Sequence, residues 1–94
     1  MNRRDQVKTQ ILGFKALLKA QRKKFALARR NLAMTERAIA RTRAKKIPLT
    51  QRESDGLNDA LKTSHEEVSK IMSSMVEMED DLKALVALLS RLRA

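Results

Sequence analysis

The chain has 94 residues and a net charge of +10, with 21 Lys and Arg against 11 Asp and Glu. This length allows one small domain, and the charge favours an anionic partner such as nucleic acid, an acidic protein surface or an anionic lipid face. The absence of Cys excludes disulfides and thiol-rich metal sites, and no stretch reaches the roughly 18 apolar residues that a membrane span needs.

The positive charge is concentrated in the first half of the sequence. Residues 1–46 hold 15 basic and 2 acidic residues (net +13), whereas residues 47–94 hold 6 basic and 9 acidic residues (net −3). With two Phe and neither Trp nor Tyr, the chain lacks the aromatic side chains that stack on bases or line ligand pockets. We therefore expect no small-molecule substrate. A cytoplasmic location is expected, because no secretory signal is recognisable and a Cys-free chain suits a reducing compartment.

An apolar repeat with alternating steps of three and four residues predicts a first helix over residues 5–46. One column of this repeat is large and apolar throughout: Ile11, Leu18, Phe25, Leu32 and Ile39. The other column changes from bulky to small or polar along the helix: Val7, Phe14, Gln21, Ala28, Thr35 and Thr42. The apolar seam is therefore predicted to thin toward the end of this helix.

A narrow basic stripe is predicted beside this seam. Its basic residues recur in steps of seven or fourteen, as two series that are one position apart. We call these eight residues the basic rail: Lys8, Lys15, Arg22, Arg29 and Arg43, with Lys23, Arg30 and Arg37. On a helix the rail is about 50 Å long, and only Glu36 interrupts it. Like charges in such a row repel one another, so the rail predicts an external anion, although a merely solvated face is the alternative.

A break at residues 46–50 separates the first helix from the second. Pro48 cannot continue a helix, which predicts a turn over residues 47–50. Thr50 and Glu53 fit a capping box at the start of the second helix. A further basic cluster surrounds the turn: Arg41, Arg43, Lys45, Lys46 and Arg52. This cluster could enter a groove or an acidic cleft, or only complement the dipole at the end of the first helix.

The second helix is predicted over residues 51–93. Ten of its 11 seam positions are apolar, which is typical of a coiled coil: Leu57, Leu61, Ser64, Val68, Ile71, Met75, Met78, Leu82, Leu85, Leu89 and Leu92. Its acids cluster away from the seam and are expected to be solvated, or to meet the rail of a second molecule: Asp59, Glu66, Glu67, Glu77, Asp80 and Asp81. The single histidine, His65, lacks the context of a phosphotransfer site.

The two helices have similar lengths and a short connection, so residues 1–94 are expected to form one all-α, antiparallel two-helix coiled-coil hairpin. In such a pair the rail faces one column of the second helix: Asn58, His65, Met72, Glu79, Val86 and Arg93. This column has one acid, so it cannot neutralise the rail. The open end has surplus apolar residues, which predict a homodimer with a local four-helix bundle: Leu12, Leu17, Val86 and Leu88.

These features favour a non-catalytic hairpin that binds a polyanion, most simply nucleic acid or a nucleic-acid-handling complex. The predicted contacts are the basic rail and the basic residues before the turn: Lys8, Lys15, Arg22, Lys23, Arg29, Arg30, Arg37, Arg41, Arg43, Lys45 and Lys46. The alternative is an adaptor or inhibitor that docks on an acidic surface of a larger protein. A membrane-surface helix is disfavoured because the seam already uses the apolar face.

No catalytic, cofactor-binding or metal-binding motif is recognisable, and we expect neither an enzyme nor a cofactor or metal site. In shape and charge the whole chain resembles small antiparallel coiled-coil hairpins. Examples are the RNA-binding Rop-type bundle and the FliJ/YscO-type stalks of secretion ATPases. This resemblance assigns no site residues.

Overall fold

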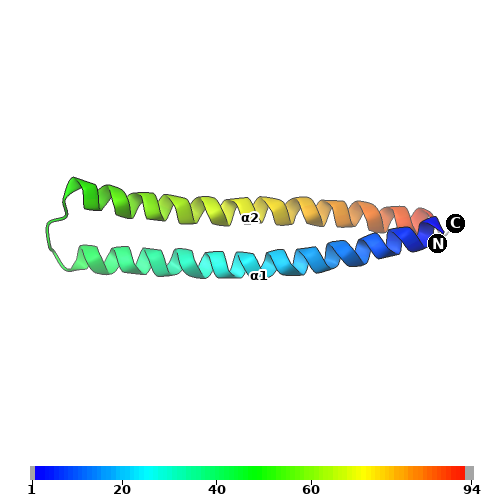
Figure 1. Cartoon of the computed structure of the whole chain (residues 1–94), viewed down its shortest axis with the longest axis horizontal. Coiled ribbons are helices and arrows are strands. Elements are labelled where there is room, and N and C mark those ends of the chain that lie inside the picture. The colour runs from blue at the N-terminus through cyan, green and yellow to red at the C-terminus, as the bar shows by residue number, and fades with distance from the viewer. Residues whose placement is uncertain (1, 93–94) are drawn as a thin grey trace.

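The computed structural model describes residues 2–92, which form two long α-helices joined by a short turn (Figure 1). Helix α1 spans Arg3–Ala44 and helix α2 spans Gln51–Arg91. The helices lie side by side in opposite directions, so the start of α1 and the end of α2 lie at the same end of the rod (Figure 1). The prediction of an all-α helical hairpin is confirmed, and the described residues contain no strand.

The first helix begins earlier than residue 5 and ends earlier than residue 46. It begins at Arg3 because the side chain of Asn2 caps it: the Asn2 Oδ1 accepts a hydrogen bond of 2.8 Å from the Asp5 amide. It ends at Ala44. Helix α2 begins at residue 51, as expected, and its predicted last residue, 93, lies outside the described residues.

The turn starts with a residue in the left-handed region. Lys46 has φ 54° and is the only described residue other than glycine with a positive φ. Its amide donates a hydrogen bond of 3.3 Å to the carbonyl of Arg43, which satisfies one of the free carbonyls at the end of α1. A glycine would adopt this conformation at lower cost, so the chain accepts local strain at this position.

The start of α2 is capped as predicted, with one difference. The Thr50 hydroxyl accepts a hydrogen bond of 3.2 Å from the Glu53 amide, as a capping box requires. The Glu53 carboxylate reaches back to the Thr50 hydroxyl, at 3.0 Å, instead of to the Thr50 amide. The hydroxyl therefore accepts one hydrogen bond and donates the other.

Burial follows the predicted seam. The buried residues of α1 all lie in its two apolar columns: Val7, Ile11, Leu18, Ala28 and Ile39. All 11 seam positions predicted for the second helix are half-buried, the last of them being Leu92 at the end of α2, and no residue of α2 is fully buried. A two-helix rod covers only one side of each helix, which explains why the core is thin.

Polar residues enter the middle and the turn half of this seam. The Gln21 amide donates a part-buried hydrogen bond of 2.8 Å to the Ser74 hydroxyl on the other helix. The hydroxyls of Thr35 and Thr42 instead bond to the carbonyls of Asn31 and Ala38, four residues earlier on α1. Because these hydroxyls are satisfied locally, threonines are tolerated in the seam without a partner on α2.

The hairpin is a rod of 70 × 17 × 16 Å with a radius of gyration of 20.9 Å. A compact chain of this length has a radius of gyration of about 12 Å. The accessible surface is 7521 Å², whereas a compact monomer of the same mass exposes about 5,500 Å². The rod thus exposes about 2,000 Å² more than a globular fold would. Neither described helix is apolar enough over a sufficient length to cross a membrane.

Candidate anion-binding face

All eight residues of the basic rail are exposed on α1. Successive residues of a helix are separated by about 100°, so the two series of the rail form a broad face and not a narrow stripe. Over residues 26–40, small side chains lie between the two series: Ala26, Ala33 and Ala40. An extended anion could therefore approach the helix backbone closely between two rows of cations.

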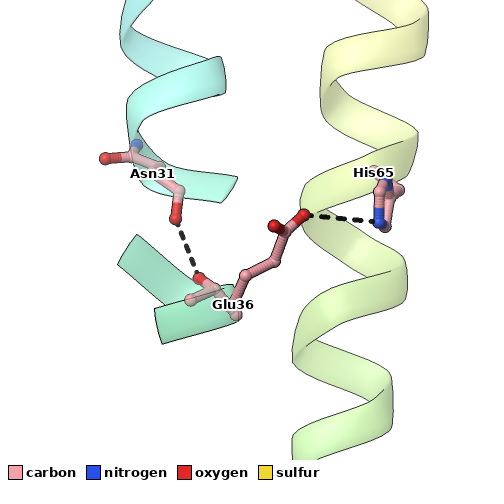
Figure 2. Close-up of polar contacts among 4 residues, drawn as sticks. Asn31, Glu36 and His65 are labelled. Atoms are coloured by element: carbon pink, nitrogen blue, oxygen red, sulfur yellow. Dashed lines mark hydrogen bonds and ion pairs between the residues drawn. The ribbon is translucent and has the colours of Figure 1, made fainter. Parts of the chain in front are cut away.

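Three cross-helix contacts show which residues of α2 lie level with the rail of α1. Arg22 Nη2 lies 3.8 Å from Glu79 Oε1, and Arg43 Nη2 donates a hydrogen bond of 3.5 Å to Asn58 Oδ1. Between them, Glu36 Oε1 lies 4.0 Å from His65 Nε2, and Figure 2 shows this carboxylate reaching from α1 toward the imidazole on α2. In all three pairs the residues of α2 belong to the column that the sequence places opposite the rail.

The same register places residues without an acid opposite the rest of the rail. It puts Met72 level with Arg29 and Val86 level with Lys15. Within residues 2–92, Arg22 is the one rail residue that forms an ion pair, and the side chains of Arg22 and Glu79 are 60% and 43% exposed. An exposed pair of this kind contributes less than about 1 kcal/mol. Helix α2 therefore leaves the charge of the rail largely uncompensated.

Arg29 packs on a residue of the seam. Its guanidinium lies 5.8 Å from the centre of the Phe25 ring, which is within range of a cation–π contact. Phe25 is half-buried, whereas Arg29 is exposed. The contact orients the guanidinium without removing its charge, so Arg29 can still bind an anion.

The basic residues around the turn are all exposed and extend the positive face to the end of the rod: Arg41, Arg43, Lys45, Lys46 and Arg52. Arg41 and Arg43 lie in the last turn of α1, where a cation also stabilises the partial negative charge of the helix end. Both roles proposed for this cluster are compatible with these positions.

The four residues predicted for self-association do not form one patch. Leu12 and Leu17 are separated by about 140° around α1, and Val86 and Leu88 by about 160° around α2. Leu12 is 68% exposed and Val86 is 46% exposed, and both lie on the side of the hairpin that carries the Arg22–Glu79 pair. We call this side the basic flank. Leu17 and the half-buried Leu88 lie on the opposite side, which we call the apolar flank.

The apolar flank has a feature that the sequence interpretation missed. A shallow groove of about 320 Å³ lies at the open end, lined by Phe14, Asp81, Ala84, Leu85 and Leu88. Beyond it, Leu27 and Met34 are 58% and 59% exposed on α1. A second repeat with steps of three and four was the available signal: Leu17, Ala20, Lys24, Leu27, Asn31 and Met34.

The remaining candidates on α2 are surface or seam residues. Its predicted acid face is exposed at every position: Asp59, Glu66, Glu67, Glu77, Asp80 and Asp81. Met75 and Met78 are half-buried in the seam and Met72 is exposed. Among the described residues, no group of three or more His, Asp or Glu is placed to hold a metal ion.

Comparison of the chain with models of protein families, with curated proteins and with solved structures gave no match. The functional argument therefore rests on the arrangement of charge and apolar surface along the rod.

Proposed function

We propose that this hairpin binds an extended polyanion, nucleic acid in particular, along the basic rail of α1. The observation that carries the proposal is the exposed row of eight basic side chains, which has one ion pair to α2 among the described residues. The rail is about 50 Å long and therefore matches a linear charge array better than a small anion. A duplex carries about one negative charge per 1.7 Å of its axis.

The composition of this face favours contacts to phosphates over contacts to bases. Lys and Arg side chains bind backbone phosphates without reading sequence. Base stacking needs exposed aromatic rings, and the two Phe of this chain are both half-buried in the seam. We therefore expect binding that depends weakly on nucleotide sequence and strongly on salt concentration.

A salt titration with a labelled duplex of random sequence tests the proposal. The observed affinity of the wild type should fall steeply as salt rises, with a log–log slope of about −0.9 for each phosphate contacted. The variant Arg22→Glu/Lys23→Glu/Arg29→Glu/Arg30→Glu should not bind at any salt concentration. The absence of wild-type binding at low salt would overturn the nucleic-acid proposal.

The matched control replaces four basic residues of α2 by Glu: Lys62, Lys70, Lys83 and Arg91. This variant changes the net charge by the same amount but leaves the rail intact. It should keep most of the affinity of the wild type. Equal losses in the two variants would show that net charge alone, and not the rail, determines binding.

A second candidate function is an adaptor or inhibitor that docks on an acidic protein surface. One observation favours it: the basic flank also exposes apolar side chains, which phosphate contacts do not need. Leu12, Met72, Val76 and Val86 are all at least 46% exposed. A protein surface with an apolar centre and an acidic rim would cover both kinds of residue.

Truncation of these apolar residues distinguishes the two functions. The variant Leu12→Ser/Val86→Ser should bind duplex like the wild type, because it keeps every cation. If the partner is a protein, the same variant should lose a partner captured from nuclease-treated host lysate. A captured partner that survives nuclease and depends on Leu12 and Val86 would favour the adaptor.

We also propose that the hairpin self-associates at its open end as a homodimer with a local four-helix bundle. The large accessible surface of the rod and the exposed leucines at this end support the proposal.

That the protein acts in the cytoplasm stays a prediction, which rests on the absence of Cys.

A further inference from the structure

The apolar residues of the rod lie on both flanks, but a second hairpin packed face to face can cover only one of them. The two flanks differ in shape. The apolar flank has the groove between Phe14 and Leu88, and Leu17 lies one turn along α1 from Phe14. Leu27 and Met34 continue this apolar surface toward the middle of the rod. This groove, together with Leu17, Leu27 and Met34, gives the apolar flank a hollow bordered by exposed apolar side chains.

The two flanks also differ in charge. Two copies joined through their basic flanks would bring two rails together, and these like charges would lose solvent and repel each other. On the apolar flank the charged side chains have both signs. Lys24 lies on α1, whereas Glu67 and Asp81 lie on α2. A two-fold axis can place Lys24 of one copy near an acid of the other, so this flank is self-complementary.

The rod as a whole exposes more surface than such an interface needs. Stable interfaces bury about 1,600 Å² in total, or about 800 Å² from each partner. The share of each partner, about 800 Å², is less than half of the roughly 2,000 Å² by which the surface of the rod exceeds that of a compact monomer. Pairing through one flank would therefore bring the exposed surface of each hairpin closer to that of a globular fold.

We infer that a second copy of this chain docks on the apolar flank, against Leu17, Leu27 and the groove between Phe14 and Leu88, and leaves both basic rails facing outward. This inference rests on the proposed self-association and names its surface. It does not rest on nucleic-acid binding. The resulting dimer presents two separate rails, so it can contact two polyanion segments at once.

Analytical ultracentrifugation of the full chain without nucleic acid tests the inference. The wild type should sediment as a dimer at high protein concentration. The variant Leu17→Glu/Leu27→Glu should weaken the dimer at least about tenfold, because two carboxylates would be buried at the interface. Both leucines are more than half exposed, so the hairpin should keep its helical circular dichroism.

The matched control is Leu12→Glu/Val86→Glu, which makes a similar change at the same end of the rod but on the basic flank. It should leave the dimer affinity unchanged within about twofold. A control variant that weakens the dimer as much as Leu17→Glu/Leu27→Glu, or more, would overturn the choice of flank. A monomeric wild type would overturn self-association itself. Neither outcome affects the duplex titration, so the failure of this inference can be distinguished from the failure of the polyanion proposal.

Discussion

The half of the seam near the open end and the half near the turn are built from different residues. Near the open end, α1 buries large side chains, namely Val7, Ile11 and Leu18. Near the turn, α1 buries Ile39, but Thr35 and Thr42 occupy the neighbouring seam positions and bond to their own helix. The comparison indicates that the open half supplies most of the stability. The turn half buries fewer large side chains of α1, with Ile39 as its one large buried residue among those described.

The test with the largest expected effect replaces a leucine by alanine in each half, at two positions of the same seam column. Leu18→Ala should lower the free energy of unfolding by about 3 kcal/mol, because Leu18 is buried. Leu32→Ala should lower it by about 1.5 kcal/mol, because Leu32 is only half-buried. Urea unfolding followed by circular dichroism measures both values. Equal losses would contradict the comparison.

The second test adds apolar surface to the turn half. Thr35→Val should raise the free energy of unfolding by about 1 kcal/mol, because a half-buried hydroxyl becomes a methyl group in the seam. Thr9→Val is the matched control. The Thr9 hydroxyl makes the same kind of bond, to the carbonyl of Asp5, but Thr9 is exposed. Thermal unfolding should show stabilisation in Thr35→Val and no gain in Thr9→Val, and the reverse order would contradict the role of the seam.

The third test concerns the end of α1. Lys46→Gly should stabilise the hairpin by about 1 kcal/mol, because glycine adopts the positive φ of this residue without the clash of a Cβ. Lys45→Gly should instead lower the free energy of unfolding by about 0.5–1 kcal/mol. Lys45 has φ −68°, a conformation that glycine does not favour over other residues, so only the entropic cost of glycine remains. Both variants remove one positive charge, so a difference between their melting temperatures reports backbone conformation. Equal melting temperatures would contradict the strain at Lys46.

The seam could be predicted from the sequence because its period is strict. The spacing of the apolar residues in steps of three and four predicted the buried and half-buried seam positions of both helices, and Pro48 predicted the break between them. The column opposite the rail was also predicted, and three of its residues make the cross-helix contacts: Asn58, His65 and Glu79. These features depend on helix geometry, which a repeat in the sequence encodes directly.

Other features could not be predicted, for identifiable physical reasons. The cap at Asn2 and the positive φ of Lys46 depend on single residues at helix ends, where no repeat exists. The split of Leu12, Leu17, Val86 and Leu88 between two flanks was, by contrast, available from the angle of each residue around its helix. The sequence interpretation missed it because it grouped these residues only by their closeness to the open end. Exposed Lys and Arg side chains have many rotamers, so a pattern predicts that the rail is exposed but does not identify the anion that we propose it binds.

The test with the smallest expected effect on stability compares the two glycines, which lie toward opposite ends of the rod. A Cβ built at Gly13 or at Gly56 meets no atom within 4 Å, so Gly13→Ala and Gly56→Ala should each stabilise the isolated hairpin by about 0.5–1 kcal/mol through helix propensity. Gly13 lies one turn before Leu17, on the flank where we expect the second copy to dock. Gly13→Ala should therefore raise the melting temperature at low protein concentration but weaken the dimer in ultracentrifugation, because a new methyl group would separate the two copies. Gly56→Ala should raise the melting temperature and leave the dimer unchanged. A dimer equally strong in both variants would place the interface away from Gly13, whereas a dimer weakened by Gly13→Ala alone would place the interface in the open half of the rod.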